Sequence, residues 1–197
     1  MNVNAYILAG GKSHRMGAPK GLKMLNGKPM IEHMIEKCSK LAEKVAIVGH
    51  PVMYKDLKLK VIGDLPQFSS LGPVSGIMAA LDDSDIMMNL VIGCDLPLVT
   101  TEILMRLMME AEDFDAFIPV HNGKLEPLCA LYHKRILEPL NRIVQSGSLK
   151  ISQIMDQFNV KYVSVENELQ RHPYVFLNVN TQDDLNVAEE IISKIKL

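Results

Sequence analysis

Short apolar runs alternate along this chain with longer segments of helical periodicity, and this alternation restricts the fold more than any other feature. The mostly apolar runs 3–8, 45–48, 60–62 and 89–93 have the length of buried strands. After the first run, the segment 29–44 places apolar residues at steps of three and four, which is typical of an amphipathic helix. The pattern therefore predicts an α/β protein with a largely parallel central sheet.

The rest of the sequence continues the same alternation. It predicts further helices over 72–81, from residue 100 onward, and over 134–145, 150–158 and 181–195, with further strands over 116–120, 128–132, 160–165 and 174–179. Strands 116–120 and 128–132 are expected to form a hairpin around Asn122-Gly123. No internal repeat and no linker rich in glycine and serine divides the sequence, so we expect a single domain over residues 1–197.

The charge balance excludes a broad basic surface. The chain has 21 Lys and Arg against 23 Asp and Glu, which gives a formal net charge of −2. Proteins whose main partner is a nucleic acid or an anionic membrane usually carry a basic surplus, so we expect neither partner here. A phosphorylated ligand would have to be bound by a local group of cations.

Cysteine usage and hydropathy point to the cytoplasm. The three cysteines, Cys38, Cys94 and Cys129, are odd in number and too far apart to predict a disulfide framework or a zinc site. No apolar run reaches the ~18 residues that a membrane span needs, and the first residues lack the basic stretch of a secretory signal. We therefore expect a cytoplasmic protein with reduced thiols.

A glycine-rich segment with two cations directly follows the first predicted strand. It contains Gly10, Gly11 and Gly17 together with Arg15 and Lys20. In α/β sheets, ligands bind beyond the carboxyl ends of the strands, where glycines let backbone N–H groups approach a phosphate closely. Two cations in the same loop would supply the positive charge that the chain as a whole lacks.

Two common phosphate-binding patterns do not match this loop. The P-loop pattern needs its first glycine at the position of Tyr6, and the dinucleotide pattern needs a glycine at the position of Lys12. On spacing alone, a phosphate-binding loop and a solvated basic loop therefore both remain open.

Asp95 stands where the most apolar predicted strand ends, in the sequence Gly93-Cys94-Asp95-Leu96-Pro97. A carboxylate at this place is costly unless it is paired or bound to a cation. Magnesium prefers one or two carboxylates together with phosphate oxygens and water, so we expect Asp95 to bind Mg²⁺ beside the glycine loop. The alternative is a cap for the following helix, for which Thr100 and Thr101 are better placed.

Other polar residues near strand ends carry less information. Asp64 follows the run 60–62 and predicts either a contact to a ribose or base, or a turn. Asn178 and Asn180 lie at the end of the last predicted strand, where alternating amides could orient metal-bound water or a phosphate. The segment 126–132 either lines a second substrate pocket or forms a buried strand.

Taken in order, these motifs resemble a known family. The opening motifs are similar to the signature of nucleotidyltransferases of the Rossmann-like glycosyltransferase A type: Leu8-Ala9-Gly10-Gly11, Arg15-Met16-Gly17, Lys20 and Asn26-Gly27-Lys28-Pro29. The motifs that resemble molybdenum cofactor guanylyltransferases in particular are Gly72-Pro73 with Gly76, Cys94-Asp95-Leu96-Pro97, Pro127-Leu128-Cys129-Ala130-Leu131-Tyr132 and Asn178-Val179-Asn180-Thr181. The resemblance implies a Rossmann-like three-layer sandwich with helices on both faces of a mostly parallel sheet.

The same resemblance implies a reaction and its participants. The reaction is the Mg²⁺-dependent transfer of GMP from GTP to molybdenum-molybdopterin, with release of pyrophosphate. The residues that the resemblance assigns to GTP are Leu8, Ala9, Gly10, Lys20, Asp64 and Asp95, with Asp95 also binding Mg²⁺, and the glycine loop adds Gly11. Arg15, Lys20 and the metal on Asp95 are expected to stabilise charge on the transferred and leaving phosphates.

One position departs from the family. The relatives commonly have an Asn near the end of the second strand, where this chain has Val48-Gly49-His50. We therefore expect His50 or a backbone group to contact the base in place of that Asn.

Three other interpretations stay open. A molybdenum cofactor cytidylyltransferase shares the loop architecture, and a sugar-1-phosphate nucleotidyltransferase usually carries more sequence than this chain has. A protein of another class would bind GTP for assembly without turnover. The sequence also leaves open whether molybdenum cofactor assembly proteins or molybdoenzyme chaperones are partners.

Overall fold

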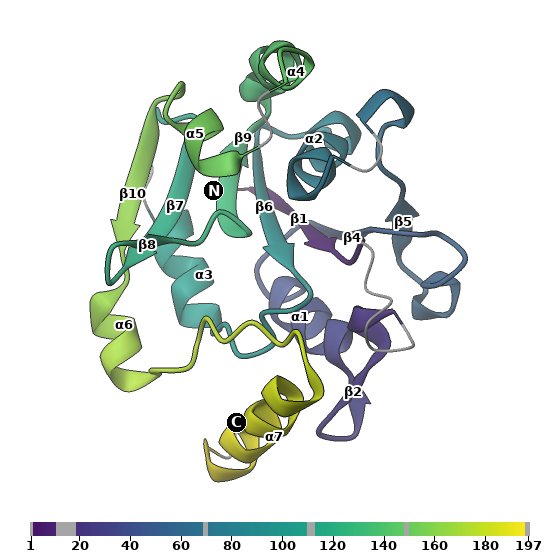
Figure 1. The fold of residues 1–197 in the computed structure, drawn as a ribbon, viewed down its shortest axis with the longest axis vertical. Helices are drawn as coiled ribbons and strands as arrows, with labels where there is room; N and C mark the ends of the chain where they lie inside the picture. The colour runs from purple at the N-terminus through teal and green to yellow at the C-terminus, as the bar shows by residue number, and fades with distance from the viewer. Residues whose placement is uncertain (1, 11–18, 69–70, 110–112, 148–149, 196–197) are drawn as a thin grey trace.

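The computed structural model describes residues 2–10, 19–68, 71–109, 113–147 and 150–195, whose arrangement is shown in Figure 1. Across the main sheet, the strand order is β5 (Lys60–Ile62), β4 (Lys44–Val48), β1 (Val3–Leu8), β6 (Met88–Gly93), β9 (Cys129–His133), β7 (Ala116–His121) and β10 (Val160–Ser164). The short β8 (Lys124–Leu125) pairs with β7. Within the described part of this sheet, β8 and β9 run antiparallel to their neighbours and the other pairings are parallel. The predicted mostly parallel sheet is confirmed.

Helices cover both faces of the sheet, which confirms the predicted three-layer sandwich (Figure 1). The helices α1 (Met30–Cys38) and α3 (Thr101–Met108) pack on one face, and α2 (Pro73–Asp83) and α4 (Leu137–Gln145) pack on the other. Alternation along β1 explains this division, because Val3, Ala5 and Ile7 pack with α1 and α3 while Tyr6 packs with α2 and α4.

The remaining elements lie around this sandwich. They are η2 (Lys20–Leu22), β2 (Met24–Leu25), β3 (Lys28–Pro29), η3 (Lys55–Leu57), η4 (Pro66–Phe68), η5 (Lys134–Ile136), α5 (Ile151–Met155), α6 (Glu166–Arg171) and α7 (Gln182–Ile195). A separate apolar cluster joins α7 to the β2–β3 hairpin: Leu185, Ala188 and Ile192 of α7 share it with Leu25 and Leu98. The hairpin β2–β3 and the helix α6 were not predicted from the sequence.

The prediction of a strand over 174–179 is wrong. The backbone N–H of Val175 donates to the carbonyl of His172, and that of Leu177 donates to Tyr174, so this stretch turns on itself. The N–H of Val179 then donates to the carbonyl of Asp95 over 2.9 Å. Because these donors bond to turns and to a loop, no ladder forms with a neighbouring strand. We call residues 172–181 the strap.

Other predicted elements differ from the observed ones at their ends, and the helix expected over 150–158 is observed as α5, Ile151–Met155. The helix expected over 29–44 ends at Cys38, because the N–H groups of Leu41 and Ala42 both return to the carbonyl of Cys38. Strands β7 and β9 do pair antiparallel, but the turn at Asn122-Gly123, with φ of 46° and 70°, joins β7 to the short β8. The chain reaches β9 only after three further residues.

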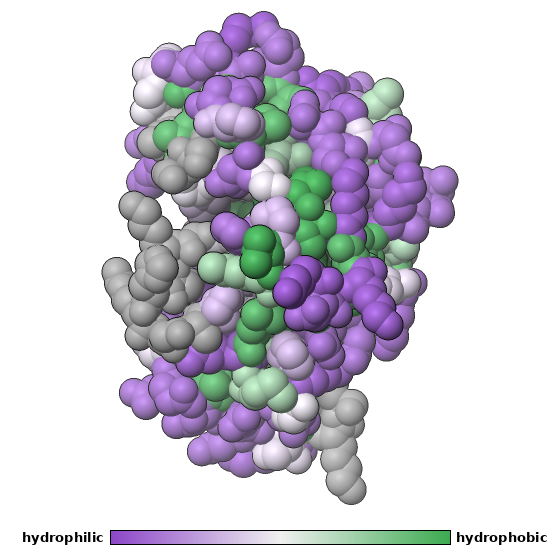
Figure 2. Space-filling view, turned by 90° about the vertical axis from the view of Figure 1, so that its right-hand side faces the viewer, coloured by the Kyte–Doolittle hydropathy of each residue, from purple (hydrophilic) through white to green (hydrophobic). Residues whose placement is uncertain are grey.

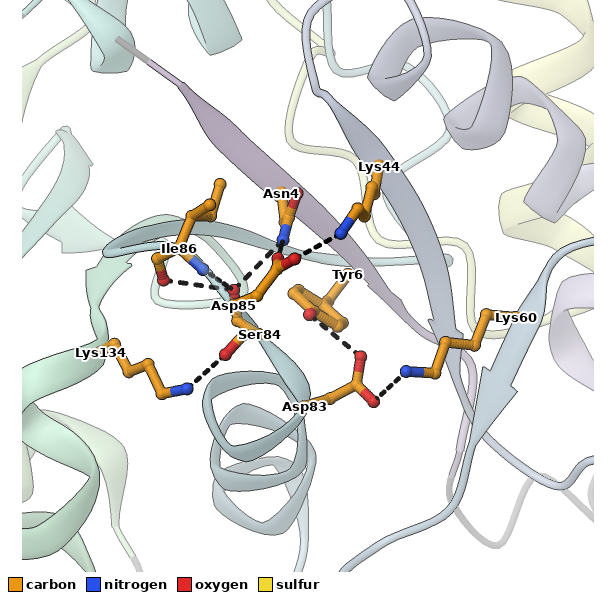
Figure 3. Close-up of polar contacts among 9 residues, drawn as sticks. All are labelled: Asn4, Tyr6, Lys44, Lys60, Asp83, Ser84, Asp85, Ile86 and Lys134. Carbon is orange, nitrogen blue, oxygen red and sulfur yellow. Dashed lines mark hydrogen bonds and ion pairs between the residues drawn. The ribbon is translucent and has the colours of Figure 1, made fainter.

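A polar cluster ties the amino edge of the sheet to the end of α2 (Figure 3). The Tyr6 hydroxyl donates to Asp83 Oδ2 over 3.2 Å, and Lys60 Nζ lies 2.5 Å from Asp83 Oδ1. The Asn4 amide donates to Asp85 Oδ1 over 3.0 Å. These contacts fix where α2 ends and the chain turns toward β6.

The face of the molecule that carries β5 is hydrophilic over most of its area, with apolar side chains gathered near its centre (Figure 2). Of the described helices, none has the length and apolar character that a transmembrane helix needs.

Candidate active site

A cavity of about 560 Å³ opens where β1, β4 and β6 end, beneath the N-terminus of α2. This volume lies within the usual range for small-ligand sites of ~300–1,000 Å³. Five of the residues predicted from the sequence line the cavity: Leu8, Gly10, Lys20, Asp64 and Asp95. The carboxyl edge of a parallel sheet is where open α/β folds bind their ligands, so the position fits the expectation.

Strand pairing brings the two predicted loops together. The N–H of Cys94 donates to the carbonyl of Leu8 over 3.0 Å, and the N–H of Ala9 donates to Val48 over 2.8 Å. These bonds extend the ladder of β1 by one residue on each side. As a result, the glycine loop after β1 and the Asp95 loop after β6 leave the sheet side by side.

Lys20 joins three distant parts of the chain at the cavity. Its Nζ lies 2.8 Å from Asp95 Oδ2 and 2.5 Å from Asn180 Oδ1. The Lys20 and Asp95 side chains are only 13% and 23% exposed, so water screens this pair less than an ion pair on the open surface. The strap reaches the same point through its backbone, because Val179 donates to the carbonyl of Asp95. Three of the predicted site residues therefore meet in one contact.

The carboxylate of Asp95 folds back over Gly93. A Cβ built on Gly93 would lie 2.4 Å from Asp95 Oδ1, a separation that real atoms do not show. The last residue of β6 must therefore be glycine if the carboxylate is to stay where it is.

The first turn of α2 forms the opposite wall of the cavity. Pro73, Ser75 and Gly76 line it, and a Cβ on Gly76 would lie 3.0 Å from Leu8 Cδ2. Glycine at this place lets α2 pack close to the end of β1. The free N–H groups and the positive end of the helix dipole at this terminus favour an anionic ligand.

Tyr54 is a supporting residue that the sequence did not indicate. Its ring is buried, its hydroxyl donates to the carbonyl of Ala9 over 3.0 Å, and the hydroxyl oxygen lies 3.1 Å from where a Gly21 Cβ would stand. Burial raises the pKa of Tyr54, which keeps the hydroxyl protonated as a donor. Tyr54 thus lies against both Ala9, which follows β1, and Gly21 in η2. A single aromatic residue in a turn gives no sequence signal of this role.

Lys37 supports the Asp95 loop from behind. Its Nζ donates to the carbonyl of Pro97 over 2.5 Å, and burial lowers the pKa of Lys37 to about 8. In the sequence, Lys37 is one of several charged residues of α1, so its contact could only be found from the fold.

The other predicted residues have more varied positions. Gly11 and Arg15 lie outside the described residues. The carbonyl of Ala9 is bonded to Tyr54, and Asn178 is half-buried in the strap. His50 is exposed and is not among the residues that line the cavity, where β4 contributes Val48.

The segment 126–132 divides between the two interpretations given above. Leu128 lines the cavity, whereas Cys129 and the residues after it form the buried strand β9. Glu126 is buried and bonds to His121 and Lys124.

Known proteins are similar to this chain over most of its length. Residues 5–161 match the MobA-like NTP transferase domain. This chain belongs to that family. A MobA-like relative from Bacillus anthracis, named probable molybdenum cofactor guanylyltransferase, is 32% identical over 192 residues, which cover 95% of this chain and 96% of that protein. A relative of the same name from Bacillus cereus is 30% identical over the same share of each chain.

Solved structures agree with this membership of the MobA-like family. The crystal structure of molybdopterin-guanine dinucleotide biosynthesis protein A from Archaeoglobus fulgidus superposes with a TM-score of 0.81 at 33% identity, covering 98% of this chain and 100% of that one. The 4-diphosphocytidyl-2C-methyl-D-erythritol synthase from Anaerococcus prevotii superposes with a TM-score of 0.74 at 13% identity, covering 98% of this chain and 96% of that one. The second likeness shows the shared fold alone.

Proposed function

We propose that this chain transfers GMP from GTP to molybdenum-molybdopterin, which gives molybdopterin guanine dinucleotide and pyrophosphate. The observation that carries the proposal is the contact of Lys20 with Asp95 and Asn180 at the mouth of the cavity. The contact brings a cation, a carboxylate and an amide together, and such a set would suit two phosphorylated substrates. The names of the relatives from Bacillus and Archaeoglobus support the same reaction.

In the proposed reaction, an oxygen of the acceptor's terminal phosphate forms a bond to the α-phosphorus of GTP. The bond between that phosphorus and the bridging oxygen to the β-phosphate breaks, and pyrophosphate leaves with the electron pair. A phosphate monoester has a second pKa of about 6, so the attacking oxygen is already largely ionised at neutral pH. The protein therefore needs no strong general base, and its task is to position the reactants and neutralise charge.

The described residues divide this task between them. Leu8, Gly10, Asp64 and the first turn of α2 line the cavity proposed for GTP. Lys20 would contact the triphosphate, and Asn178 and Asn180 would face the acceptor. Gly11 and Arg15 are proposed to add backbone donors and a second cation.

The residues present fit a magnesium ion. Asp95 turns a carboxylate oxygen toward Lys20 at the cavity, and no group of three or more His, Cys, Asp or Glu within the described part of the chain could hold a metal alone. Magnesium commonly uses one or two carboxylates and takes its other ligands from substrate phosphates and water, so we propose Asp95 as the ligand that the protein would supply. When bound, the ion would neutralise negative charge on the phosphates.

The substitution Asp95→Asn tests the proposal. We expect pyrophosphate release from GTP and molybdenum-molybdopterin to fall by about 100-fold or more, since a charge-stabilising group is lost. The matched control is Asp85→Asn, an exposed carboxylate at the other edge of the sheet, which should keep the wild-type rate. Full magnesium-dependent turnover by Asp95→Asn would contradict the assignment.

The same assay separates the alternatives. Wild-type protein is given GTP, CTP or ATP with molybdenum-molybdopterin and Mg²⁺, and pyrophosphate is measured. Fastest turnover with GTP is the expected result. Fastest turnover with CTP would indicate a cytidylyltransferase, and GTP binding without pyrophosphate release would indicate a non-catalytic GTP-binding protein.

A further inference from the structure

Three buried residues pack together where β7 ends. In the strand order of the sheet, β7 lies far from β4 and β5. The three residues are His121 at the end of β7, Glu126 between β8 and β9, and Phe176 in the strap, with exposures of 9%, 5% and 7%. The His121 Nε2 lies 3.0 Å from Glu126 Oε1. The His121 ring stacks on the Phe176 ring, with centroids 4.8 Å apart and planes at 6°. The roles assigned above to the site use none of these residues.

Glu126 holds the His121 ring in one orientation. The backbone N–H of Glu126 donates to Pro119 over 3.0 Å, and Lys124 Nζ lies 2.8 Å from the same Oε1 that His121 contacts. Because a carboxylate accepts, His121 Nε2 is the donor. His121 Nδ1 is buried and has no partner among the described residues. The Nε2 atom of the ring therefore bonds to Glu126, and the ring face packs on Phe176.

The strap continues from Phe176 directly to the site. Its backbone is bonded to the carbonyl of Asp95 through Val179, and its Asn180 side chain reaches Lys20. Since the strap has no strand ladder, its position depends on the few buried side chains that anchor it. Phe176 is one of these anchors.

We propose that His121, oriented by Glu126, is a positioning residue that acts through Phe176 to hold the strap and so place Asn178 and Asn180 for the acceptor. This inference rests on the proposed function for the identity of the acceptor. The positioning itself is a property of the chain and can be measured without turnover. Among the described residues that line the cavity, none comes from the strap, so the loss of His121 should affect the acceptor more than GTP.

The test compares His121→Ala with His121→Phe, which keeps a ring face on Phe176 but cannot bond to Glu126. For His121→Ala we expect the KM for molybdenum-molybdopterin to rise about 3- to 10-fold, as the usual strength of an aromatic pair implies. The Kd for GTP, measured by calorimetry, should stay within about twofold. His121→Phe should recover the part of this loss that comes from the ring stack, while the part that depends on the bond to Glu126 should remain lost. The matched control His133→Ala, at the far end of β9, should leave both constants unchanged.

Amide hydrogen exchange supplies a readout that needs no reaction. The Val179 N–H, which donates to Asp95, should exchange about 3- to 10-fold faster in His121→Ala than in the wild-type chain or in His121→Phe. If His121→Ala fails to fold, Phe176→Leu removes the same stack and should give the same changes in KM and exchange. Equal exchange at Val179 in all variants, or equal rises in the acceptor KM and the GTP Kd, would overturn the inference. Failure of GMP transfer by the wild-type chain, with faster Val179 exchange in His121→Ala, would refute the proposed function while the inferred positioning stands.

Discussion

Lys20 is the cation that the described residues bring to the cavity of a chain whose net charge is −2, and we propose it as the residue that contacts phosphates. Lys20, Asp95 and Asn180 were each expected at the site from their places after predicted strands. Their contact links positions 75 and 160 residues apart in the sequence. Residue type and local context are readable from the sequence, but side-chain pairing over such separations depends on the fold.

Lys37 adds a pH-dependent contribution to stability. Burial lowers its pKa from 10.5 to about 8, so between these values the unfolded chain binds more protons than the folded chain. The cost of burying the charge is full below pH 8, on the order of 3 kcal/mol, and it disappears as the pH rises toward 10.5. In Lys37→Met this contribution is absent. Urea denaturation should therefore show the wild type gaining free energy of unfolding relative to Lys37→Met between pH 8 and 10.5.

Lys40→Met, which removes an exposed lysine just after α1, is the control for this measurement. Its difference from the wild type should not follow the same pH dependence. A constant difference between wild type and Lys37→Met across the whole range would contradict the prediction.

At the scale of elements, the end of β6 sets the geometry of the site. Gly93 ends the strand, and the Asp95 carboxylate occupies the space that a side chain on Gly93 would need. The strap depends on this carboxylate loop as well, since Val179 bonds to the Asp95 carbonyl. One strand terminus thus positions both the proposed metal ligand and the segment proposed to face the acceptor.

Gly93→Ala should separate activity from folding. The added methyl group must push the carboxylate by about 1 Å, a displacement that can cost on the order of 100-fold in rate. We expect kcat for pyrophosphate release to fall by about that factor, while circular dichroism shows an intact fold. Gly63→Ala is the control, because a Cβ there meets no atom within 4 Å and Gly63 also follows a strand of the same sheet. Wild-type kcat in Gly93→Ala would show that the carboxylate position does not matter.

At the scale of the whole molecule, the two edges of the sheet carry different features. The carboxyl edge holds the cavity, and the amino edge holds the polar cluster of Figure 3. In that cluster, Lys44 and Asn4 bond to Asp85 while Tyr6 bonds to Asp83, so the first residues of β1 and β4 are fastened to the end of α2. The helix in turn presents its N-terminus to the cavity at the opposite edge.

Tyr6→Phe tests whether the polar cluster affects stability without affecting turnover. Burial raises the pKa of Tyr6 to about 12, so its hydroxyl remains a donor to Asp83 at neutral pH. Removing the hydroxyl should lower the free energy of unfolding by about 1 kcal/mol, the usual net value of one hydrogen bond. The kcat and KM for pyrophosphate release should not change. Tyr162→Phe, at an exposed position in β10, should change neither property. A large loss of turnover in Tyr6→Phe would mean that the amino edge also affects the site.

The sequence by itself determined the class of fold and most of the strands and helices, because the burial of one or two faces imposes a local period on the chain. It also located Lys20, Asp95 and Asn180 correctly near the carboxyl edge. Only the tertiary structure decided that 174–179 belongs to the strap, since Val175 and Phe176 are buried by packing on other elements and the N–H groups of this stretch have no strand beside them. The same holds for Tyr54, Lys37 and His121. Their roles arise from contacts between segments far apart in the sequence, and such contacts leave no local period to read.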